Sequence, residues 1–254
     1  MLLSKKTFIV TGGASGLGAA CVRKLRDSEA NVVIADLNEE GAKVAENLGS
    51  NVMFVKTDVA SEDDVKKMLD KVEETFGDIH GVVQCAGIAT AARILTPKGP
   101  HSLELFEKTI RVNLIGTFNV MRLAAERIAK HDPAKDEEEC GVIINTASVA
   151  AFDGQIGQVA YSASKGGVAA MTLPAARDLA RYKIRVMTIA PGTFYTPMLA
   201  KLPEKVRIAL EKLTPFPPRL GRPDEFANLV LSIIQNPMLN GEVIRIDGAL
   251  RMPP

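Results

Sequence analysis

TFIVTGGASGLG, residues 7–18, joins a short apolar run to a turn that contains four glycines. The run 7–11 predicts a strand, and the apolar spacing that starts at Leu17 predicts a helix directly after the turn. In such a turn, glycines let backbone amides approach a pyrophosphate, and the positive end of the helix favours the anion. A tight strand-to-helix turn also needs glycine for its own backbone, so the interpretation depends on the rest of the chain. The candidate phosphate-binding residues are Gly12, Ser15, Gly16, Leu17 and Gly18.

Apolar runs of strand length recur through the whole chain. After 7–11 they are NVVIAD (31–36), NVMFVKT (51–57), IHGVVQC (79–85), GVIINTA (141–147), IRVMTIA (184–190) and EVIRID (242–247). They are continuous rather than alternating, which is typical of strands buried on both faces of a parallel sheet. Helical patterns alternate with them, and no linker or repeat interrupts the series. The sequence therefore predicts one α/β domain over residues 1–254, a Rossmann-like doubly wound domain with a seven-stranded parallel sheet and helices on both faces.

Capping residues predict where some of the helices begin and end. Ser61 and Asp64, three positions apart, form a helix-start pattern before an apolar stripe. Gly49 and Gly77 stand where the preceding helices are expected to stop. A long helix is expected to start near Ser102.

Three long connections depart from the regular spacing of strands and helices. They are residues 88–101, 131–140 and 192–222. Long loops inside a compact α/β domain are usually functional. We therefore expect them to determine substrate specificity, and we take 192–222 as the main substrate loop.

The composition excludes several classes of protein. The chain has 254 residues, of which 46% are hydrophobic and 24% charged, as in an ordinary globular protein rather than a disordered one. The 31 basic and 30 acidic residues leave a net charge of +1, so no global field attracts nucleic acid. Three scattered cysteines and the lack of any Cys/His cluster predict no metal site and fit a reducing intracellular compartment. No apolar run approaches the ~18 residues of a membrane span.

Two acidic residues at strand ends are candidates for contacts with an adenosine. Asp36 ends the second strand, 18 residues after Gly18, where a carboxylate binds the ribose hydroxyls of NAD and repels the 2′-phosphate of NADP. No Arg or Lys follows at 37–40 to neutralise such a phosphate. Asp58, at the end of the third strand, is placed to approach the adenine, although a helix cap or turn role is nearly as plausible.

A serine, a tyrosine and a lysine form the candidate catalytic group. Ser148 follows the fifth strand, and Tyr161 and Lys165 lie one turn apart on the next helix, hence on one face. A tyrosine with a pKa of about 10 is a poor base at neutral pH unless a cation stabilises its phenolate. At ~4 Å and an effective dielectric constant of ~20, a positive charge contributes about 4 kcal/mol, or roughly three pKa units. We therefore expect Lys165 to bring the pKa of Tyr161 toward neutrality and Ser148 to hold the substrate oxygen.

Together these motifs resemble the short-chain dehydrogenase/reductase family. The matching segments are Thr11 to Gly18, QCAG (84–87), Asn113, Ser148, YSASK (161–165) and Pro191-Gly192. The resemblance implies a catalytic tetrad that includes Asn113 as the residue ordering a proton-relay water; packing inside a helix is the alternative for Asn113. Gln84 departs from the asparagine more usual in the family, which puts the hydrogen bonding of that strand in doubt.

Within the family, the chain is most similar to enzymes that oxidise 3-hydroxyacyl-CoA thioesters and hydroxysteroids, especially from residue 141 onward. This similarity implies homotetramers, which are mitochondrial in eukaryotes and cytoplasmic in bacteria. It also implies NAD contacts at Ser15, Leu17, Asp36, Asp58, Val59, Cys85, Ala86, Gly87, Tyr161, Lys165, Pro191, Gly192, Phe194 and Thr196. Ser148, Gln158 and Tyr161 are the implied substrate-binding residues.

The leading hypothesis is NAD-dependent interconversion of L-3-hydroxyacyl-CoA and 3-ketoacyl-CoA, with Tyr161 as the base. Oxidation of steroid or other secondary alcohols is the first alternative, and a scaffold subunit in a larger assembly is the second. Coenzyme A carries phosphates, so its site should offer cations at the rim of the cleft. Arg93 and Lys98 in the loop 88–101 are the candidates, with Lys201 and Lys205 approaching from the other side. For any single one of these residues, a solvated loop charge is an equally good interpretation.

Overall fold

The computed structural model describes residues 1–130, 139–200 and 204–254. Within them the main sheet is seven-stranded and parallel, with the order β3-β2-β1-β4-β7-β8-β9. Its strands are β1 (Thr7–Thr11), β2 (Asn31–Asp36), β3 (Val52–Lys56), β4 (Gly81–Gln84), β7 (Gly141–Thr146), β8 (Ile184–Pro191) and β9 (Val243–Ile246). All seven coincide with the predicted apolar runs, and the predicted α/β fold is confirmed.

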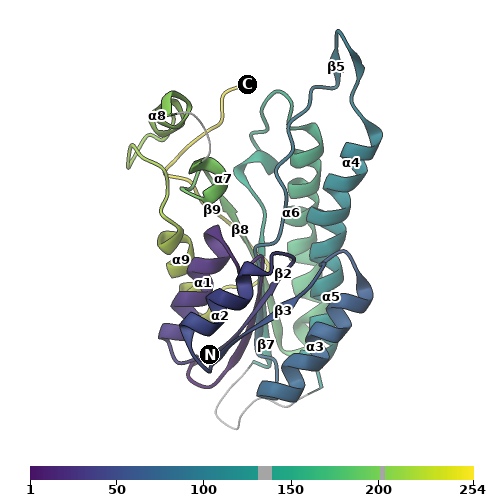
Figure 1. Cartoon of the computed structure of the whole chain (residues 1–254), viewed down its shortest axis with the longest axis vertical. Helices are drawn as coiled ribbons and strands as arrows, with labels where there is room; N and C mark the ends of the chain where they lie inside the picture. Colours follow the sequence, from purple (N-terminus) through teal and green to yellow (C-terminus); the bar gives the residue numbers. More distant parts are fainter. Residues whose placement is uncertain (131–138, 201–203) are drawn as a thin grey trace.

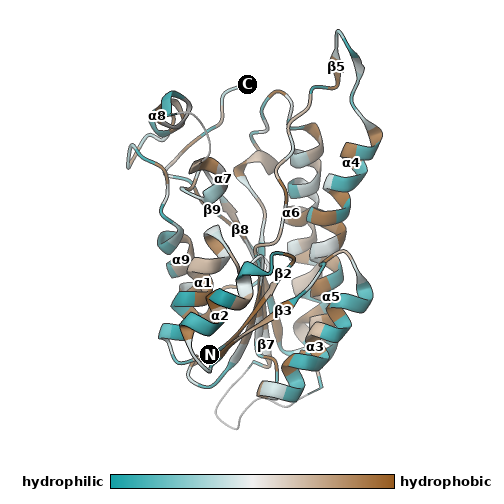
Figure 2. Cartoon of the chain, viewed as in Figure 1, coloured by the Kyte–Doolittle hydropathy of each residue, from teal (hydrophilic) through white to brown (hydrophobic). Residues whose placement is uncertain are grey.

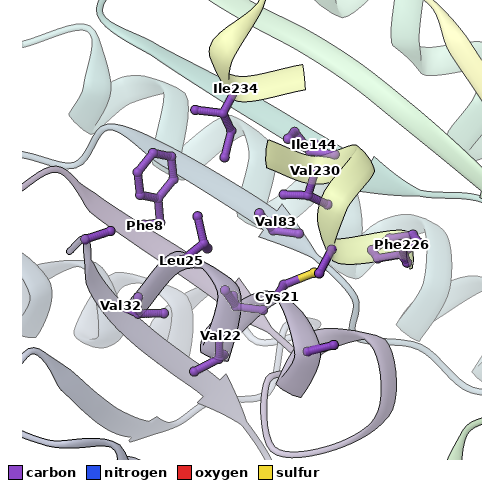
Figure 3. Close-up of a cluster of buried hydrophobic side chains, with 14 of the residues drawn as sticks. Phe8, Cys21, Val22, Leu25, Val32, Val83, Ile144, Phe226, Val230 and Ile234 are labelled. Carbon is purple, nitrogen blue, oxygen red and sulfur yellow. The ribbon is translucent and has the colours of Figure 1, made fainter. Parts of the chain in front are cut away.

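Helices cover both faces of this sheet (Figure 1). On one face lie α1 (Gly16–Asp27), α2 (Glu40–Leu48) and α9 (Pro223–Gln235), and on the other lie α3 (Glu62–Phe76), α5 (Gly116–Ile128) and α6 (Val159–Leu179). Hydrophobic residues concentrate on the strands and on the inner sides of the helices (Figure 2). Figure 3 shows Phe8 of β1 beside Leu25 of α1 and Ile234 of α9, in the same cluster as Val230 and Phe226 of α9.

The capping residues act as the sequence predicts. The Ser61 hydroxyl accepts a hydrogen bond from the Asp64 amide at 3.2 Å and begins α3. Gly49 and Gly77 end α2 and α3 with φ angles of 104° and 76°, which favour glycine. These positions are therefore determined by local chemistry.

The helix expected to start near Ser102 is not one continuous α-helix. Ser102 caps α4 (Leu103–Ile110), but a π-helical turn, η1 (Arg111–Ile115), separates α4 from α5. The π-turn contains Asn113, which is fully buried. A π-turn inserts one residue into the helical repeat and is frequent at functional sites, so the interruption coincides with a predicted tetrad residue.

The long connections carry small elements of their own. Residues 88–101 contain a hairpin, β5 (Leu95–Thr96) and β6 (Gly99–Pro100), which stands away from the main sheet at one end of the molecule (Figure 1). The loop after β8 contains α7 (Pro197–Ala200) and α8 (Glu204–Lys212). Of the remaining connection, 131–140, residues 131–138 lie outside the described residues.

The order of strands places a switch point between β1 and β4. The chain runs from β1 outward through β2 and β3, then returns to continue from β4 in the other direction. In open α/β sheets, ligands bind outside the carboxyl ends of the strands at such a point. In the described residues, no helix is long and apolar enough to cross a bilayer.

Candidate active site

The glycine turn follows β1 at the switch point. Gly12 adopts φ +66°, and a Cβ there would lie 2.7 Å from the Ala86 amide nitrogen. A Cβ on Gly18 would lie 2.2 Å from the Gly12 carbonyl oxygen, so both positions require glycine. Ser15 is the N-cap of α1, but its side chain makes no capping bond, and the first turn of α1 holds no acidic residue. The positive end of α1 thus carries no acidic side chain of its own first turn, which fits a pyrophosphate.

Asp36 braces this turn from the end of β2. Its Oδ2 accepts a hydrogen bond from the Ala14 amide, and its Oδ1 accepts one from the Asn38 amide, each at 3.0 Å. Lys56 lies opposite Asp36 in the register of β2 and β3, but its ammonium pairs with Glu39 at 2.6 Å. The carboxylate therefore lies beside the glycine turn with free lone pairs for ribose hydroxyls.

Asp58 and Val59 hold the turn between β3 and α3. The Asp58 carboxylate accepts a hydrogen bond from the Ala60 amide at 2.9 Å, and the backbone amide of Asp58 donates one to the Asp64 carboxylate at 3.2 Å. These bonds correspond to the turn role that sequence reasoning considered as the alternative for Asp58. Val59 is buried, and its carbonyl accepts from the Asn119 side chain at 2.9 Å.

The chain leaving β4 passes directly beside the glycine turn. The Cys85 amide donates to the Thr11 carbonyl at 3.0 Å, and the Ala86 amide donates to the Thr11 hydroxyl at 3.2 Å. A Cβ on Gly87 would lie 3.1 Å from Asn113 Oδ1 and 3.6 Å from Lys165 Nζ. Residues 85–87 thus connect the turn to two residues of the predicted tetrad.

Cys85 also contacts a second thiol. It shares a hydrogen bond with Cys21 of α1, which lowers the pKa of Cys85 and, with burial, raises that of Cys21. The hydroxyl of Thr146 lies 3.8 Å from the Cys85 sulfur. The Cys85 side chain is therefore held between α1 and the end of β7.

Gln84 takes the place of the usual asparagine without leaving its side chain unpaired. Its Nε2 donates to Asn145 Oδ1 at 2.9 Å across the β4–β7 pair, and both residues are buried. The longer side chain thus keeps a hydrogen bond between the two strands. The Asn145 Nδ2, by contrast, has no hydrogen-bond partner among the described residues.

Ser148, Tyr161 and Lys165 come together as the sequence predicts. Ser148 begins the short helix η2 (Val149–Ala151), and its hydroxyl is hydrogen-bonded to the Tyr161 phenol. Lys165 is buried, and its Nζ lies 5.9 Å from the centre of the Tyr161 ring. The same ammonium donates to the Thr146 carbonyl at 2.7 Å. A proton donor, a hydroxyl that holds an oxygen and a buried cation are therefore in one place.

The effect of Lys165 on Tyr161 differs from the expectation. Burial raises the pKa of Tyr161 above its usual value, and only the Ser148 hydroxyl counteracts this. Burial also lowers the pKa of Lys165 to about 8. The expectation that Lys165 by itself lowers the pKa of Tyr161 is therefore wrong for the chain alone, because the ammonium faces a carbonyl and is itself destabilised by burial.

The Asn113 side chain is fully occupied in joining two segments. Its Oδ1 accepts from the Ile88 amide at 2.8 Å, and its Nδ2 donates to the Ile88 carbonyl at 2.9 Å and to Ser164 Oγ at 3.1 Å. These bonds hold the start of the 88–101 loop against α6. These bonds favour a role in which Asn113 positions the loop and α6, which is similar to the packing role considered as the alternative. Its role in a catalytic tetrad stays a prediction.

The segment after β8 closes the cofactor side. Gly192, directly after Pro191, donates its amide to the Ile246 carbonyl at 3.0 Å. Phe194 is buried, and its ring packs edge-to-face on the ring of Phe226 with 6.3 Å between the two ring centroids. The Phe194 ring therefore belongs to the core. Thr196 faces the glycine turn, since a Cβ on Gly16 would lie 3.6 Å from its Cγ2. Thr196 thus lies where a ligand on the turn would meet it.

The predicted substrate residues are distributed over two loops. Gln158 caps α6, and its Oε1 accepts from the Gln155 amide at 3.0 Å. Arg93 lines a cavity of about 490 Å³ between the 88–101 loop and residues 154–159. That cavity also reaches Ser162, next to Tyr161, but not Tyr161 itself.

Two of the other candidate cations do not line this cavity. Lys98 is in the exposed turn of the hairpin, and Lys205 is exposed on α8. Lys201 lies outside the described residues. The structure therefore separates Arg93 from Lys98 and Lys205.

Sequence reasoning missed two residues of the site. The Thr146 carbonyl accepts from Lys165, and Ser164 joins Asn113 to the Tyr161 carbonyl. Ser164 stands in the YSASK segment, three positions after Tyr161, and this spacing could have indicated it. A backbone carbonyl such as that of Thr146 carries no sequence signal. In the described residues, no group of three or more His, Cys, Asp or Glu could hold a metal ion.

A family model described as short chain dehydrogenase matches residues 6–207. The chain belongs to the short-chain dehydrogenase family. This membership makes it an oxidoreductase that acts with a nicotinamide cofactor on a small-molecule substrate. The family resemblance drawn from the motifs is thereby confirmed.

Several short-chain dehydrogenases are similar to the chain over nearly its whole length. The 3-hydroxyacyl-CoA dehydrogenase type-2 of Drosophila melanogaster is 54% identical over 256 residues, covering 100% of both chains. The human enzyme of the same name is 54% identical over 249 residues, 97% of this chain and 95% of its own.

Solved structures give the same result. That of 3-hydroxyacyl-CoA dehydrogenase type-2 from Mycobacterium avium has a TM-score of 0.94 at 44% identity, covering 98% of this chain and 97% of that one. That of 3-ketoacyl-(acyl-carrier-protein) reductase from Brucella melitensis, complexed with NADH, has a TM-score of 0.87 at 27% identity, covering 98% of this chain and 100% of that one.

Proposed function

We propose that the protein is an NAD-dependent dehydrogenase that interconverts L-3-hydroxyacyl-CoA and 3-ketoacyl-CoA. The observation that carries the proposal is the grouping of Ser148, Tyr161 and Lys165 beside the glycine turn, in a chain more than half identical to dehydrogenases named for this substrate. The scaffold alternative has no observation in its favour. Oxidation of a steroid or other secondary alcohol by the same residues is the second candidate.

The residues present fit an NAD molecule. The open amino end of α1 would hold the pyrophosphate, and the Asp36 carboxylate would accept hydrogen bonds from the adenosine ribose. The same carboxylate would repel the extra phosphate of NADP, and Lys56 is engaged with Glu39. Thr196 and the chain at 85–87 would border the rest of the dinucleotide.

The chain's own residues would handle the substrate oxygen and its proton. When bound, the nicotinamide ring supplies the hydride acceptor or donor. The Ser148 hydroxyl holds the substrate oxygen beside the phenol, and Tyr161 takes a proton from it in oxidation or gives one in reduction. Lys165, with its pKa near 8, provides a proton exchange partner on the buried side of Tyr161.

In this proposal the two proton sites titrate as one pair, since Lys165 Nζ lies 5.9 Å from the centre of the Tyr161 ring. The forms with a neutral phenol and neutral amine, or with a phenolate and an ammonium, carry the same number of protons. If Lys165 releases the first proton, its neutral amine must then take the phenol proton before Tyr161 can act as the base. The proposal thus adds proton exchange to the expected role of the Lys165 charge.

The substrate side supports a thioester through Arg93. Arg93 lines the same cavity as Ser162, one residue from Tyr161, and the two loops that form it follow the carboxyl ends of β4 and β7, where ligands bind. The cavity wall is mostly apolar, with Ile94, Leu95 and Ile156. Such a surface suits an acyl chain next to a charged rim.

The homotetramer implied by the family resemblance is part of this proposal. Large apolar side chains are exposed on η1, α5 and α6, namely Ile115, Phe118 and Leu173, with exposed fractions of 45–48%. An apolar face of this kind is typical of subunit contacts. Light scattering of the purified protein would give the number of subunits directly.

The experiment that tests the function is a comparison of two substrate classes. Steady-state kcat/KM is measured for acetoacetyl-CoA with NADH and for an uncharged ketosteroid with the same cofactor. The proposal expects the thioester to be preferred by at least about tenfold, equivalent to ~1.4 kcal/mol of transition-state binding. A clear preference for the steroid would establish the second candidate, and no turnover of either would leave the scaffold role.

A further inference from the structure

The loop 152–158 joins the two elements that carry the catalytic hydroxyls. Ser148 and η2 precede it, and α6 with Tyr161 follows it. Residues 154–157 of this loop also form one wall of the 490 Å³ cavity, opposite residues 92–95. Whatever fixes this loop therefore determines the shape of the space next to the catalytic residues.

The strand β9 reaches this loop through Arg245. Its Nη2 lies 2.5 Å from Asp153 Oδ2, and its Nε lies 2.7 Å from Asp247 Oδ2. The guanidinium also lies 5.5 Å from the centre of the Phe152 ring and donates to the Leu250 carbonyl at 2.9 Å. One side chain therefore contacts two loop residues and the segment that follows β9.

The segment after β9 makes two further bonds to the same loop. The Met252 amide donates to the Asp153 carboxylate, and the Gln155 side chain donates to the Pro253 carbonyl at 3.2 Å. The Arg245 guanidinium lowers the pKa of Asp153, so the carboxylate is charged at neutral pH. The side chains of Arg245 and Asp153 are only 21% and 20% exposed, so water screens the pair less than a surface pair.

The opposite wall of the cavity is connected to the loop by the backbone. The Ala92 amide donates to the Gly157 carbonyl at 2.7 Å, and Gly157 adopts φ +87°. A displacement of the loop at Asp153 would thus be transmitted to residues 92–95, which include Arg93. The two walls and β9 form one connected unit.

We infer that Arg245 is a positioning residue for substrate specificity: through Asp153 it holds the loop 152–158 against β9 and so sets the distance between the two walls of the substrate cleft. The inference rests on the proposed function for the identity of the substrate. Tyr161 and Lys165 have independent supports in α6 and at the Thr146 carbonyl, so Arg245 acts on substrate binding rather than on the chemical step.

The test uses the variants Asp153→Asn and Arg245→Met in the full-length chain. Each is expected to raise KM for acetoacetyl-CoA about five- to tenfold, with kcat and KM for NADH within about twofold, because ~1 kcal/mol of positioning corresponds to a factor of this size. The double variant should show no further increase. Asp153→Glu keeps the carboxylate and should restore most of the affinity.

Arg251→Met is the matched control. Arg251 also contacts Asp247, at 3.3 Å, and it is 63% exposed. Its charge acts on Asp153 from a distance, but among the described residues its side chain bonds to Asp247 and the Leu250 carbonyl and not to the loop 152–158. It should leave KM for the thioester unchanged. Equal increases in this control, additive effects in the double variant or unchanged KM in both single variants would overturn the inference.

Amide hydrogen exchange gives a readout that does not depend on the substrate. Asp153→Asn and Arg245→Met should speed exchange in residues 152–158, while Arg251→Met should not. If the wild type fails to turn over the thioester but exchange rises in this loop, the proposed function is wrong and the positioning role stands. If the wild type is active and exchange stays unchanged, the positioning role is wrong.

Discussion

The cofactor side and the substrate side of the site are built differently, although both lie at the carboxyl edge of one sheet. On the cofactor side, a Cβ on Gly12 or Gly18 would lie within 3 Å of backbone atoms, and the Ala14 amide of the turn donates to Asp36. On the substrate side, a hairpin, the loop 152–158 and α8 carry exposed apolar and charged residues. The difference supports the proposal that the residues at the sheet carry the chemistry and that the loops select the substrate.

This division predicts that a change at the Tyr161 phenol lowers kcat more than any other change considered and leaves NADH binding nearly unchanged. Tyr161→Phe removes the ionisable hydroxyl but keeps the ring, so kcat should fall by about 10³-fold or more. The dissociation constant for NADH, measured by fluorescence titration, should change by less than about twofold. Residual activity within a factor of about ten of wild type would require another base.

A change at Asp36 should affect only the cofactor side. Asp36→Ala removes the acceptor for the Ala14 amide and the predicted ribose contacts. The ratio of kcat/KM for NAD to that for NADP should fall by about 10- to 100-fold, since one lost charged hydrogen bond is worth about 1.5–3 kcal/mol. Parallel assays with both cofactors measure this ratio.

Asp58→Ala is the control for the Asp36 variant. Asp58 lies two residues after the end of β3, and its carboxylate accepts from the amide two residues on, as that of Asp36 does. It should change the cofactor ratio far less. Equal kcat/KM values for NAD and NADP in the wild type would remove Asp36 from the ribose site.

The pH profile tests the coupling of Tyr161 and Lys165. Because the pKa of Lys165 is lowered to about 8, the pair releases its first proton near pH 8, and kcat/KM for oxidation should rise through this value. Lys165→Met leaves only the phenol, whose pKa burial raises, so the rise should move above the usual tyrosine range. An unchanged midpoint in Lys165→Met would show that the lysine does not share the proton.

The smallest effect is expected at the rim of the substrate side. Arg93→Ala with Lys98→Ala should raise KM for acetoacetyl-CoA about two- to fivefold, more at low salt, because exposed charges contribute up to about 1 kcal/mol and are screened. Arg93→Ala alone should cause most of this increase in KM, since Lys98 does not line the cavity. An equal change in KM for an uncharged steroid would indicate altered loop structure instead of lost charge.

The parts of the fold that the sequence predicts are those with local or periodic causes. Continuous apolar runs located all seven strands, and Ser61, Gly49 and Gly77 placed helix ends by their own backbone chemistry. The π-turn at 111–115 has no such signal, and the side chain of its buried Asn113 bonds to Ile88 and Ser164, which are distant in the sequence.

The candidate site shows the same limit. Residue types and spacing brought Ser148, Tyr161 and Lys165 together correctly, but the direction of the pKa of Tyr161 depends on burial and on where the ammonium points. Arg245 is a second example, because it lies 92 residues from Asp153 in the sequence and only the sheet brings them together. Long-range contacts of this kind cannot be predicted from one sequence.

The most direct test of the central claim is the oxidation of L-3-hydroxybutyryl-CoA with NAD, followed as NADH absorbance beside the same assay on the D enantiomer. The proposed function predicts NADH formation and an equal amount of acetoacetyl-CoA from the L enantiomer, with loss of the signal in Tyr161→Phe. A wild-type protein that forms no NADH from the L enantiomer while it oxidises a steroid alcohol would contradict the claim.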